Sequence, residues 1–525
     1  MSITNNIANK RTRILWTDDE IDILRPHLIF LNEKGYDVDT ATNGKDAVDL
    51  LRINHYDIIL LDENMPGISG IDTLNKIREI NPVVPVVMIT KSEEENIMET
   101  AIGSKIADYL IKPVNPKQIL LSIKKNLETR KLITRETTSA YQAEFANLGQ
   151  LINQATSYIH WEDVYKKLVY WELELEASED ASMFEVFKMQ KLDAGKGFSK
   201  FIRNNYLAWF TDKSSDKPLF SPAVFREKVF PLVETNQKVF VILMDNLRLD
   251  QWRMIFPLIN HYYTPVDDGL FCSILPTATQ YARNAMFAGL MPMEISTMYP
   301  KLWLNDDEEG IKNQFEEQLL QHQLTRLGRR YRIYYEKIIH NRSGKKLIDN
   351  VANLLDYDLV FIVYNFIDTL SHANTELEMI RELAGNDSAY RSLILSWFQH
   401  SQLFDLIKIL SEKNITIVFT TDHGSIRVTN PVKVIGDKKT SANLRYKTGK
   451  NLNYTPREVF EIRDPRTAHL PKSDVSSSYI FAMYDDFFAY PNNFNHYAGY
   501  YRNTFQHGGI SLEEMIVPVI TMKPR

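Results

Sequence analysis

The sequence predicts an α/β protein in which two sheets of mainly parallel strands are joined by a helical segment. Short apolar runs alternate with amphipathic helical patterns over residues 13–124, and the same alternation returns after a polar break at 214–218. Between these regions, apolar residues recur three and four positions apart. A chain of 525 residues is too long for one ordinary core. We therefore expect three domains, at 1–126, 127–206 and 207–525.

The composition is that of an ordinary globular protein, with 44% hydrophobic and 24% charged residues. The net charge of −6 gives no general attraction to nucleic acid or acidic membranes, although local patches can provide one. A single cysteine, Cys272, excludes an internal disulfide framework and indicates a reducing compartment. The first ten residues contain no apolar signal region, and the apolar runs are only as long as strands. We therefore expect a cytoplasmic protein that does not insert into membranes.

The first predicted sheet brings acids, a hydroxyl and an ammonium group to one edge. Its strands are predicted at 13–17, 57–61, 84–89 and 107–111. They end beside Asp18-Asp19, Asp62, Thr90 and Lys112, respectively. Because the carboxyl ends of parallel strands meet at one edge, this doubly wound sheet is expected to gather these side chains into a site.

This segment resembles the receiver domain of two-component response regulators over nearly its whole length. The resemblance implies that Asp62 is the phospho-acceptor, and that Asp18 and Asp19 hold Mg²⁺. Magnesium prefers a few carboxylates together with phosphate oxygens and water. The backbone carbonyl of Asn64 would complete the metal shell.

The same resemblance assigns a switch to three further residues. It implies that Lys112 pairs with the phosphoryl group, that Thr90 closes onto it and that Tyr109 is the rotating aromatic. Each has a structural alternative: Lys112 as a solvated charge, Thr90 as a strand-end hydroxyl and Tyr109 as a packing residue. Phosphorylation adds nearly two negative charges, enough to drive a local two-state change. Similar receivers pair through the face formed here by about Glu93 to Leu127, so a homodimer on phosphorylation is expected.

The segment between the two sheets is predicted to be a small helical bundle. Helical periods occur at 117–127, 139–158, 161–177 and 181–192. The first of these is expected to be the last helix of the first domain and to run onward into the bundle. Gly195 and Gly197 are expected to interrupt the helical pattern before a further stretch at 198–206. The aromatic residues of the segment favour a core over a nucleotide platform. No helix-turn-helix with a basic recognition helix is evident, so DNA binding lacks its usual signature.

The stretch Ser273–Gly289 is the central candidate-site motif of the second predicted sheet. It breaks at Pro276 and places two hydroxyls, Thr277 and Thr279, just before a predicted helix. Thr279 can cap that helix, which puts its side chain at a positive dipole end. Such a position suits an anionic group such as phosphate. The alternative is a plain helix cap.

Other stretches supply ligands for metal ions. Apolar strands are predicted at 240–245, 359–368 and 415–422. The side chains suited to metal binding are Asp245, Asp368, His372, Asp422, His423 and His507. Asp368 and His372 lie on one face if the chain is helical there. Oxygen and nitrogen ligands of this kind suit two zinc ions, with manganese the less favoured metal.

These motifs resemble the alkaline phosphatase superfamily, and specifically its PglZ branch, over about 300 residues. The resemblance implies two metal sets: Asp368, His372 and His507, and Asp245, Thr279, Asp422 and His423. It places the nucleophile at Thr279 rather than Thr277, because diesterases of the superfamily carry it second in a Pro-Thr-x-Thr stretch. They also carry a glycine ten residues on, here Gly289. Gln280-Tyr281 departs from those diesterases, so the resemblance does not extend to substrate contacts beyond the metals.

The residue types fit phosphoryl transfer. A threonine hydroxyl needs a metal to become a nucleophile near neutral pH. Two metals about 4 Å apart can bind the attacking and leaving oxygens. Arg283 and Asn284, one turn beyond Thr279, are positioned to contact a non-bridging phosphate oxygen. The alternative for Arg283 is a salt bridge on the helix surface.

Two further stretches have open interpretations. The basic insert at 427–457 is either a solvated loop or a mobile flap over a polyanionic substrate. It contains Lys433, Lys438, Lys439, Arg445, Lys447 and Lys450. The aromatic-rich stretch at 490–505 either stacks bases or packs in the core.

The whole architecture resembles PorX-type response regulators of the type IX secretion system. This resemblance implies a sensor histidine kinase, an extracytoplasmic-function sigma factor and the secretion machinery as partners. We interpret the protein as a phosphorylation-controlled, zinc-dependent phosphodiesterase acting on nucleotides or oligonucleotides. The alternative is a binding module with structural zinc that engages the sigma factor or the secretion machinery, and a transcription factor is a distant third. The reactive hydroxyl of Thr279 favours the enzyme.

Overall fold

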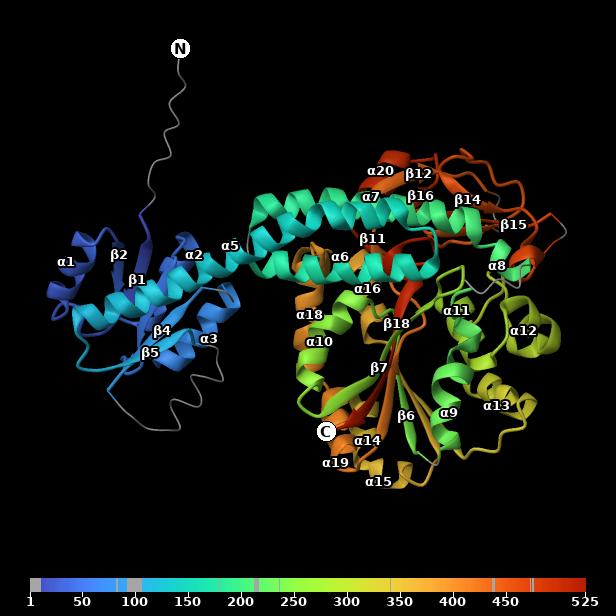
Figure 1. Cartoon of the computed structure of the whole chain (residues 1–525), viewed down its shortest axis with the longest axis horizontal. Coiled ribbons are helices and arrows are strands. Elements are labelled where there is room, and N and C mark those ends of the chain that lie inside the picture. Colours follow the sequence, from blue (N-terminus) through green and yellow to red (C-terminus); the bar gives the residue numbers. More distant parts are fainter. Residues whose placement is uncertain are drawn as a thin grey trace, which may run out of the picture. The chain divides into compact units, whose positions relative to one another are not determined.

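The computed structural model describes residues 11–81, 84–91, 106–178, 180–211, 217–235, 237–339, 341–436, 440–472, 474 and 476–525, with the backbone alone at 128–133 and 341–342. The chain forms two compact units, Met1–Ala140 and Tyr141–Arg525 (Figure 1). No helix among the described residues is long and apolar enough to cross a membrane.

The first unit contains a five-stranded parallel sheet with the order β2-β1-β3-β4-β5. Its strands are β1 (Arg13–Thr17), β2 (Asp37–Ala41), β3 (Ile58–Asp62), β4 (Val86–Thr90) and β5 (Asp108–Ile111). Its helices include α1 (Arg25–Glu33), α2 (Gly44–Ile53), α3 (Gly70–Ile80) and the first part of α5 (Pro116–Gln154). This is the predicted doubly wound sheet.

Both faces of this sheet are covered, because alternate residues of each central strand enter different cores. Ile59 and Leu61 of β3 pack in one core with residues of α2 and α3. Ile58 and Leu60 pack in the other with residues of α1 and α5. All five residues of β3 are buried, so its final residue, Asp62, is held rigidly at the edge of the sheet.

The helical segment agrees with its prediction in one place and differs in another. α5 runs without interruption over 39 residues, so the predicted helix that begins at 117 does continue into the helical segment. α7 (Ala181–Asn205) continues through Gly195 and Gly197, so the predicted interruption is wrong. A Cβ at Gly195 would lie 2.0 Å from the Tyr484 ring, and one at Gly197 would lie 2.8 Å from the Trp161 ring. These glycines therefore allow close packing and do not end a helix.

α6 (Tyr158–Ser178) and α7 share one core with the second sheet. Trp161 and Tyr165 of α6 and Phe198 of α7 are buried in it, which confirms the prediction that the aromatics form a core. The two helices run side by side in Figure 1. The short helix α8 (Ala208–Thr211) follows them.

Buried ion pairs also join α6 to the second sheet's helices. Arg391 of α18 (Asp387–Gln399) is 1% exposed, and its Nη1 lies 3.2 Å from Glu172 Oε1 and 2.7 Å from Asp250 Oδ2. Arg391 also pairs with Glu176. Buried charges of this kind are strongly destabilising if one partner is removed.

The second unit contains a six-stranded sheet with the order β7-β18-β10-β6-β9-β8. The strands are β6 (Val239–Met244), β7 (Tyr263–Cys272), β8 (Ile333–Ile338), β9 (Leu359–Tyr364), β10 (Thr416–Thr420) and β18 (Ile516–Pro524). β10, β6, β9 and β8 are parallel, whereas β18 is antiparallel to both β10 and β7. All residues of β6, β9 and β10 are buried, as in a sheet covered on both faces.

Besides α6, α7 and α8, the second unit contains further helices. They are α9 (Phe230–Glu234), α10 (Leu249–Ile259), α11 (Thr279–Ala288), α12 (Pro292–Met298), α13 (Glu316–Arg326), α14 (Asn341–Asp349), α15 (Val351–Leu354), α16 (Phe366–Glu376), α17 (Glu378–Leu383), α18 (Asp387–Gln399), α19 (Gln402–Glu412), α20 (Phe494–Tyr501) and α21 (Leu512–Met515). The predicted α/β class is therefore confirmed for the second unit as well.

The basic insert forms short strands, which corrects the expectation of a loop. The strand pairs are β11 (Ile426–Arg427) with β17 (Phe505–Gln506), and β12 (Asn430–Lys433) with β16 (Asp486–Ala489). A third sheet has the order β13 (Tyr446–Gly449), β15 (Ser478–Ala482) and β14 (Val459–Ile462).

Two of the insert's basic residues are buried in this β-structure. Arg445 is fully buried, with Nη2 2.6 Å from Glu514 Oε2. Lys447 is 3% exposed and donates to the carbonyl of Ser441 at 2.7 Å. They are therefore structural and do not form a solvated or mobile charge run. Lys438 and Lys439 lie outside the described residues.

Candidate metal centre and receiver site

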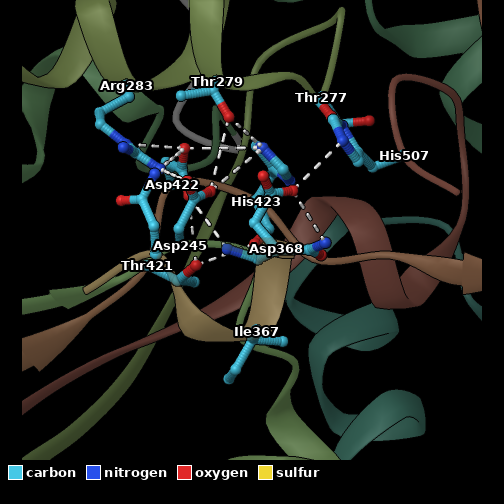
Figure 2. A network of polar contacts seen from close by, with 12 residues as sticks. Asp245, Thr277, Thr279, Arg283, Ile367, Asp368, Thr421, Asp422, His423 and His507 are labelled. Atoms are coloured by element: carbon cyan, nitrogen blue, oxygen red, sulfur yellow. Dashed lines mark hydrogen bonds and ion pairs between the residues drawn. The ribbon is translucent and has the colours of Figure 1, made fainter. Parts of the chain in front are cut away.

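Three acidic residues meet at the carboxyl ends of three neighbouring parallel strands, β10, β6 and β9. Asp245 directly follows β6, Asp422 lies two residues after β10, and Asp368 lies in the first turn of α16 after β9. Open α/β sheets place their sites at these strand ends. Figure 2 shows the three carboxylates grouped with Thr279, His423 and His507.

The first predicted metal set lies on the solvent-exposed side of this group of residues. Asp368, His372 and His507 each offer a ligand atom, and these atoms lie within 4.8 Å of one another. His372 Nε2 lies 3.6 Å from Asp368 Oδ2, and His507 Nε2 lies 3.6 Å from Asp368 Oδ1. The helix of α16 places Asp368 and His372 one turn apart, as predicted. The side chain of His372 is 62% exposed, so this set is accessible from solvent.

The second set is buried. Asp245, Asp422 and His423 are at most 1% exposed, and their ligand atoms also lie within 4.8 Å of one another. His423 Nε2 lies 3.6 Å from Asp422 Oδ2 and 3.9 Å from Asp245 Oδ1. The rings of His423 and His507 stack with centroids 4.3 Å apart, so the two sets adjoin.

The ring orientation of two histidines fits metal binding. His423 Nδ1 donates to the carbonyl of Gly424 at 3.1 Å, and His507 Nδ1 donates to the carbonyl of Thr277 at 3.2 Å. Each hydrogen bond fixes the tautomer and leaves Nε2 as the lone-pair nitrogen directed at the carboxylates. The donor sets of both clusters therefore suit zinc, which is bound in proteins by histidine nitrogen and carboxylate oxygen.

The electrostatics of the site also favour bound cations. Burial, together with Asp422 and Asp368 nearby, raises the pKa of Asp245 well above its ordinary value despite Arg283. Burial opposes ionisation of Asp422 as well, but Arg283 and His423 outweigh it and lower its pKa to about 2. Burial and the neighbouring His423 lower the pKa of His507 to about 3, which keeps its ring neutral as a metal ligand requires.

The two threonines of the stretch Ser273–Gly289, Thr277 and Thr279, have different surroundings. Thr277 is fully buried; it donates to the carbonyl of Gly509 at 2.9 Å and accepts from the amide of Gly508 at 3.0 Å. Thr279 is partly exposed, and its Oγ1 lies 3.2 Å from His423 Nε2 and 3.5 Å from Asp245 Oδ1. Thr277 therefore supports the loop that carries His507, whereas the hydroxyl of Thr279 faces the buried metal set.

The predicted capping role of Thr279 is not observed. Ala278 occupies the N-cap position of α11, and no side chain caps the helix. Thr279 is the first helical residue, so its hydroxyl is free to face His423 and Asp245. The helix ends at Gly289, which has a left-handed φ of 61°. A Cβ there would lie 2.2 Å from the Gln323 side chain, so glycine is required for both conformation and space.

Neither Arg283 nor Asn284 is placed to contact a substrate phosphate. Arg283 is fully buried and is not a surface residue, and it contacts the carboxylates of Asp245, Asp422 and Glu316. Asn284 is 1% exposed and donates to the carbonyl of Lys312 at 3.0 Å. The expectation of a contact with a phosphate oxygen is therefore corrected for both residues.

Two polar residues of the site were not predicted. Asn246 has a φ of 68°; its amide donates to Asp422 Oδ1 and its Nδ2 to Asp368 Oδ1, both at 3.4 Å. It therefore links the acids of the two metal sets. Thr421 Oγ1 donates to Asp422 Oδ1 at 3.4 Å and to the carbonyl of His423 at 2.8 Å. The sequence feature that could have identified Asn246 and Thr421 is their position next to Asp245 and Asp422 at strand ends.

The residues of the aromatic-rich stretch at 490–505 differ in their exposure to solvent. Phe505 stacks on Tyr390 with ring centroids 3.9 Å apart and is buried. Tyr497 and Tyr500 of α20 are 39% and 37% exposed. The guanidinium of Arg381 lies 4.9 Å from the ring centroid of Tyr500. Core packing therefore applies to Phe505, whereas base stacking by Tyr497 and Tyr500 stays a prediction.

In the first unit, the predicted receiver residues gather at one edge of the sheet. Asp18, Asp19 and Asp62 each offer an oxygen within 4.8 Å of the others. Lys112 Nζ lies 2.8 Å from Asp18 Oδ2 and 3.0 Å from Asp62 Oδ2. Asp62 Oδ1 is buried without a hydrogen-bond partner in the described part of the chain, which fits coordination of a cation such as Mg²⁺.

The remaining receiver residues lie near this cluster or flank it. Thr90 is buried at the end of β4, and its carbonyl accepts a hydrogen bond from the amide of Lys112 at 2.7 Å. Tyr109 of β5 is partly buried and packs against a core of the first unit. Asn64 is exposed, two residues after Asp62. Their switching and coordinating roles stay predictions.

Comparison with protein families gives three matches. The model of the BREX system PglZ alkaline phosphatase-like domain matches residues 224–522, more than half of the chain. The model of the PorX response regulator linker domain matches residues 131–210, and that of the response regulator receiver domain matches residues 14–124.

Several curated relatives share the receiver region. The transcriptional regulatory protein ResD of Bacillus subtilis is 36% identical over 113 residues, which cover 22% of this chain and 47% of ResD. The alginate biosynthesis regulator AlgB of Pseudomonas aeruginosa is 35% identical over 24% of this chain and 28% of AlgB. SrrA of Staphylococcus aureus is 32% identical over 26% of this chain and 57% of SrrA. The matched region thus spans between about a quarter and three fifths of the length of these relatives.

Solved receiver structures match the same region. A CheY-like receiver domain from Methanospirillum hungatei is 26% identical and covers 23% of this chain and 95% of its own, with a TM-score of 0.22. A two-component response regulator from Clostridium difficile is 32% identical and covers 22% of this chain and 97% of its own, also with a TM-score of 0.22.

Proposed function

The chain belongs to the PglZ family of alkaline phosphatase-like domains and has the receiver and linker of a PorX-type response regulator, and from this we propose that it is a phosphorylation-controlled, zinc-dependent phosphodiesterase. The observation that carries the proposal is the position of Thr279. Its hydroxyl is free of any capping bond and lies 3.2 Å from His423 Nε2, beside the buried ligand set.

The ligand sets described above would hold two zinc ions, which would supply Lewis acidity to the attacking hydroxyl and to the leaving oxygen. Thr279 Oγ1 is the group positioned to attack phosphorus. Its bond to phosphorus forms as the ester bond to the leaving alcohol breaks; the Thr279 hydroxyl proton is released to solvent, and the leaving oxygen takes up a proton from solvent. Water then cleaves the phosphothreonine and restores Thr279. The hydrogen bonds of Asn246 hold Asp422 and Asp368 in fixed positions relative to each other during these steps.

A catalytic role is favoured over structural zinc by the exposure of the first set. Structural zinc sites are usually closed, whereas catalytic sites keep a position open. His372 is 62% exposed, and Thr279 is a hydroxyl that a structural site would not need. The binding-module alternative has no comparable observation in its favour.

Nucleotides or oligonucleotides are the proposed substrates. Tyr497 and Tyr500 present partly exposed rings on α20, which leads into β17 and His507. Arg381 contacts Tyr500 and also donates to the carbonyl of Asn374 in α16, the helix that carries His372. Exposed aromatics next to a phosphate site suit base stacking.

Control by phosphorylation is proposed through the receiver. A sensor histidine kinase would modify Asp62, with Mg²⁺ held by Asp18, Asp19 and Asp62. The phosphorylated form is proposed to dimerise in the cytoplasm. An extracytoplasmic-function sigma factor and type IX secretion components are proposed partners, on the basis of the PorX-type domain order.

The decisive experiment combines a metal assay with hydrolysis. Purified protein is repleted with zinc, its metal content is measured, and cleavage of a small chromogenic phosphodiester is followed with and without a chelator. We expect bound zinc and chelator-sensitive hydrolysis. Stable zinc without hydrolysis of either the small diester or a short oligonucleotide would favour the binding module instead.

A further inference from the structure

The first turn of α11 carries Thr279 and has no side-chain cap. An uncapped first turn has unsatisfied N–H groups and gains no stability from a capping bond. The two side chains that directly follow Thr279 are instead bonded to the loop that leads into α13. Gln280 Nε2 donates to the carbonyl of Leu304 at 2.8 Å. The hydroxyl of Tyr281 donates to Asp306 Oδ2 at 2.9 Å. This turn is therefore held by partners outside the helix.

The loop that leads into α13, residues 303–312, is tied together by its own hydrogen bonds. Trp303 Nε1 donates to Asn305 Oδ1 at 3.0 Å. The amide of Asn305 donates to the side chain of Glu308, and Lys312 Nζ donates to the carbonyls of both residues. Because these bonds connect the two ends of the loop, it offers α11 partners in fixed positions.

Two tyrosines share the carboxylate of Asp306. Its Oδ2 accepts from Tyr281 of α11, and its Oδ1 accepts from the hydroxyl of Tyr446 in β13 at 3.1 Å. Both tyrosines are buried, at 1% and 5% exposure, respectively. The ring of Tyr281 also packs edge-on against Trp303, with centroids 5.6 Å apart. The two hydroxyls are therefore chemically alike and differ in the element that they connect to the loop.

We propose that Gln280 and Tyr281 are positioning residues, which anchor the first turn of α11 to the 303–312 loop and thereby direct Thr279 Oγ1 at the buried metal set. Thr279 lies next to both in this turn, and its Oγ1 is 3.2 Å from His423 Nε2. Displacement of a reacting group by about 1 Å can lower a rate by roughly 10²-fold, so such anchors affect turnover more than substrate binding. The inference rests on the proposed function, because it assigns the attack on phosphorus to Thr279.

The test compares Tyr281→Phe with Tyr446→Phe, each of which removes one hydroxyl from Asp306 and keeps the ring. Both variants should keep their zinc and should lose a similar amount in unfolding temperature. Only Tyr281→Phe is expected to lower kcat for a small chromogenic diester, by about 10-fold or more, with a smaller change in KM. Steady-state kinetics, thermal unfolding and elemental analysis measure these effects. Equal kcat values in the two variants would overturn the inference.

A double-mutant cycle asks whether Tyr281 acts through Asp306. Asp306→Ala should lower kcat at least as much as Tyr281→Phe, and the double variant should be no slower than Asp306→Ala alone. Additive losses would contradict the anchor, because Tyr281 would then act independently of the loop. Gln280→Ala removes the other anchor and should also lower kcat. It takes the place of Tyr281→Phe if that variant does not fold, and a wild-type kcat for it would then overturn the inference.

A thiol probe reports the position of residue 279 without turnover. Thr279→Cys is combined with each tyrosine variant, and alkylation by iodoacetamide is followed after metal has been removed with a chelator. The native Cys272 is fully buried, so labelling reports the introduced thiol. The rate should change several-fold with Tyr281→Phe and stay unchanged with Tyr446→Phe.

The two readouts separate the inference from the proposed function. Equal labelling rates with Tyr281→Phe and Tyr446→Phe would overturn the anchoring of α11. Absence of metal or hydrolysis in the wild type would instead overturn the proposed function. In that case a changed labelling rate with Tyr281→Phe alone would still support the anchor, because labelling needs neither metal nor turnover.

Discussion

Thr279 Oγ1 lies 3.2 Å from His423 Nε2, and this contact joins the first turn of α11 to the segment that follows β10. It brings together residues 144 positions apart in the chain. The tautomer of His423, set by its bond to the carbonyl of Gly424, leaves Nε2 available on the side of the hydroxyl.

The first prediction separates the two threonines. Thr279→Ala should lower diester hydrolysis by roughly 10³-fold or more, because it removes the hydroxyl proposed to attack phosphorus. Thr277→Ala should keep the nucleophile but lose the hydrogen bonds to Gly508 and Gly509, which destabilises the fold by about 1–3 kcal/mol. Steady-state kinetics and thermal unfolding of both variants provide the measurement. Wild-type turnover in Thr279→Ala would instead indicate attack by a water molecule or by Thr277.

The second prediction concerns the metals themselves. The double variant Asp245→Ala/Asp368→Ala should lose both zinc ions, because it removes one carboxylate from each ligand set. Elemental analysis after zinc repletion measures the loss. Asp387→Asn, which alters a partly buried acid paired with Arg248 outside the ligand sets, is the control and should retain zinc. Equal metal content in wild type and double variant would contradict the assigned ligands.

The third prediction concerns pH. Burial lowers the pKa of Lys447 from 10.5 to about 8. Between these values the unfolded chain binds the proton and the folded chain does not, so the free energy of unfolding should rise with pH across this window. The gain from this group is at most about 3 kcal/mol. Urea unfolding at several pH values in this window should show a smaller rise for Lys447→Met than for wild type.

Lys450→Met is the control for that series, because Lys450 is 41% exposed and pairs with Asp474 at the surface. It should keep the pH dependence of the wild type. The Lys447 and Lys450 variants should also cleave an oligonucleotide and a small diester in the wild-type ratio. A selective loss on the oligonucleotide for Lys447→Met would restore the role of a basic flap for that residue.

The fourth prediction concerns phosphorylation. A beryllofluoride mimic with Mg²⁺ should shift the wild type from monomer toward dimer, and Asp62→Ala should not respond. Leu121 of α5 is 66% exposed and lies on the predicted pairing face, of which residues 93–105 are outside the described residues. Light scattering with and without the mimic measures the change. An unchanged mass for the modified wild type would exclude the dimer switch.

The fifth prediction concerns the glycines of α7. Gly195→Ala should destabilise the protein by about 1–3 kcal/mol, because the new methyl group would overlap the Tyr484 ring at 2.0 Å. Gly149→Ala in α5 is the control, since its nearest neighbour would lie 3.5 Å away. It should be neutral or slightly stabilising, as expected for alanine in a helix. Equal unfolding temperatures for the two variants would contradict the close packing of α7 on Tyr484.

The sequence was sufficient for features that depend on local patterns. Apolar runs ending on acids placed Asp245 and Asp422 at strand ends, and helical spacing placed Asp368 beside His372. Features that depend on distant partners were not predictable in this way. The burial of Arg283 involves Glu316, 33 residues away, and the need for a glycine at position 195 of α7 comes from the ring of Tyr484. A glycine that permits close packing and a glycine that ends a helix look the same in sequence.

The position of β18 has a consequence for biosynthesis. This strand, Ile516–Pro524, lies inside the six-stranded sheet between β7 and β10, and β10 leads directly to Asp422 and His423. During translation, β10 therefore lacks its neighbour on that side until residues 516–524 have left the ribosome. The receiver sheet is complete some 400 residues earlier, and domains generally fold as units during synthesis. The nascent chain would thus carry a complete receiver sheet well before it can complete the sheet that positions the candidate metal centre.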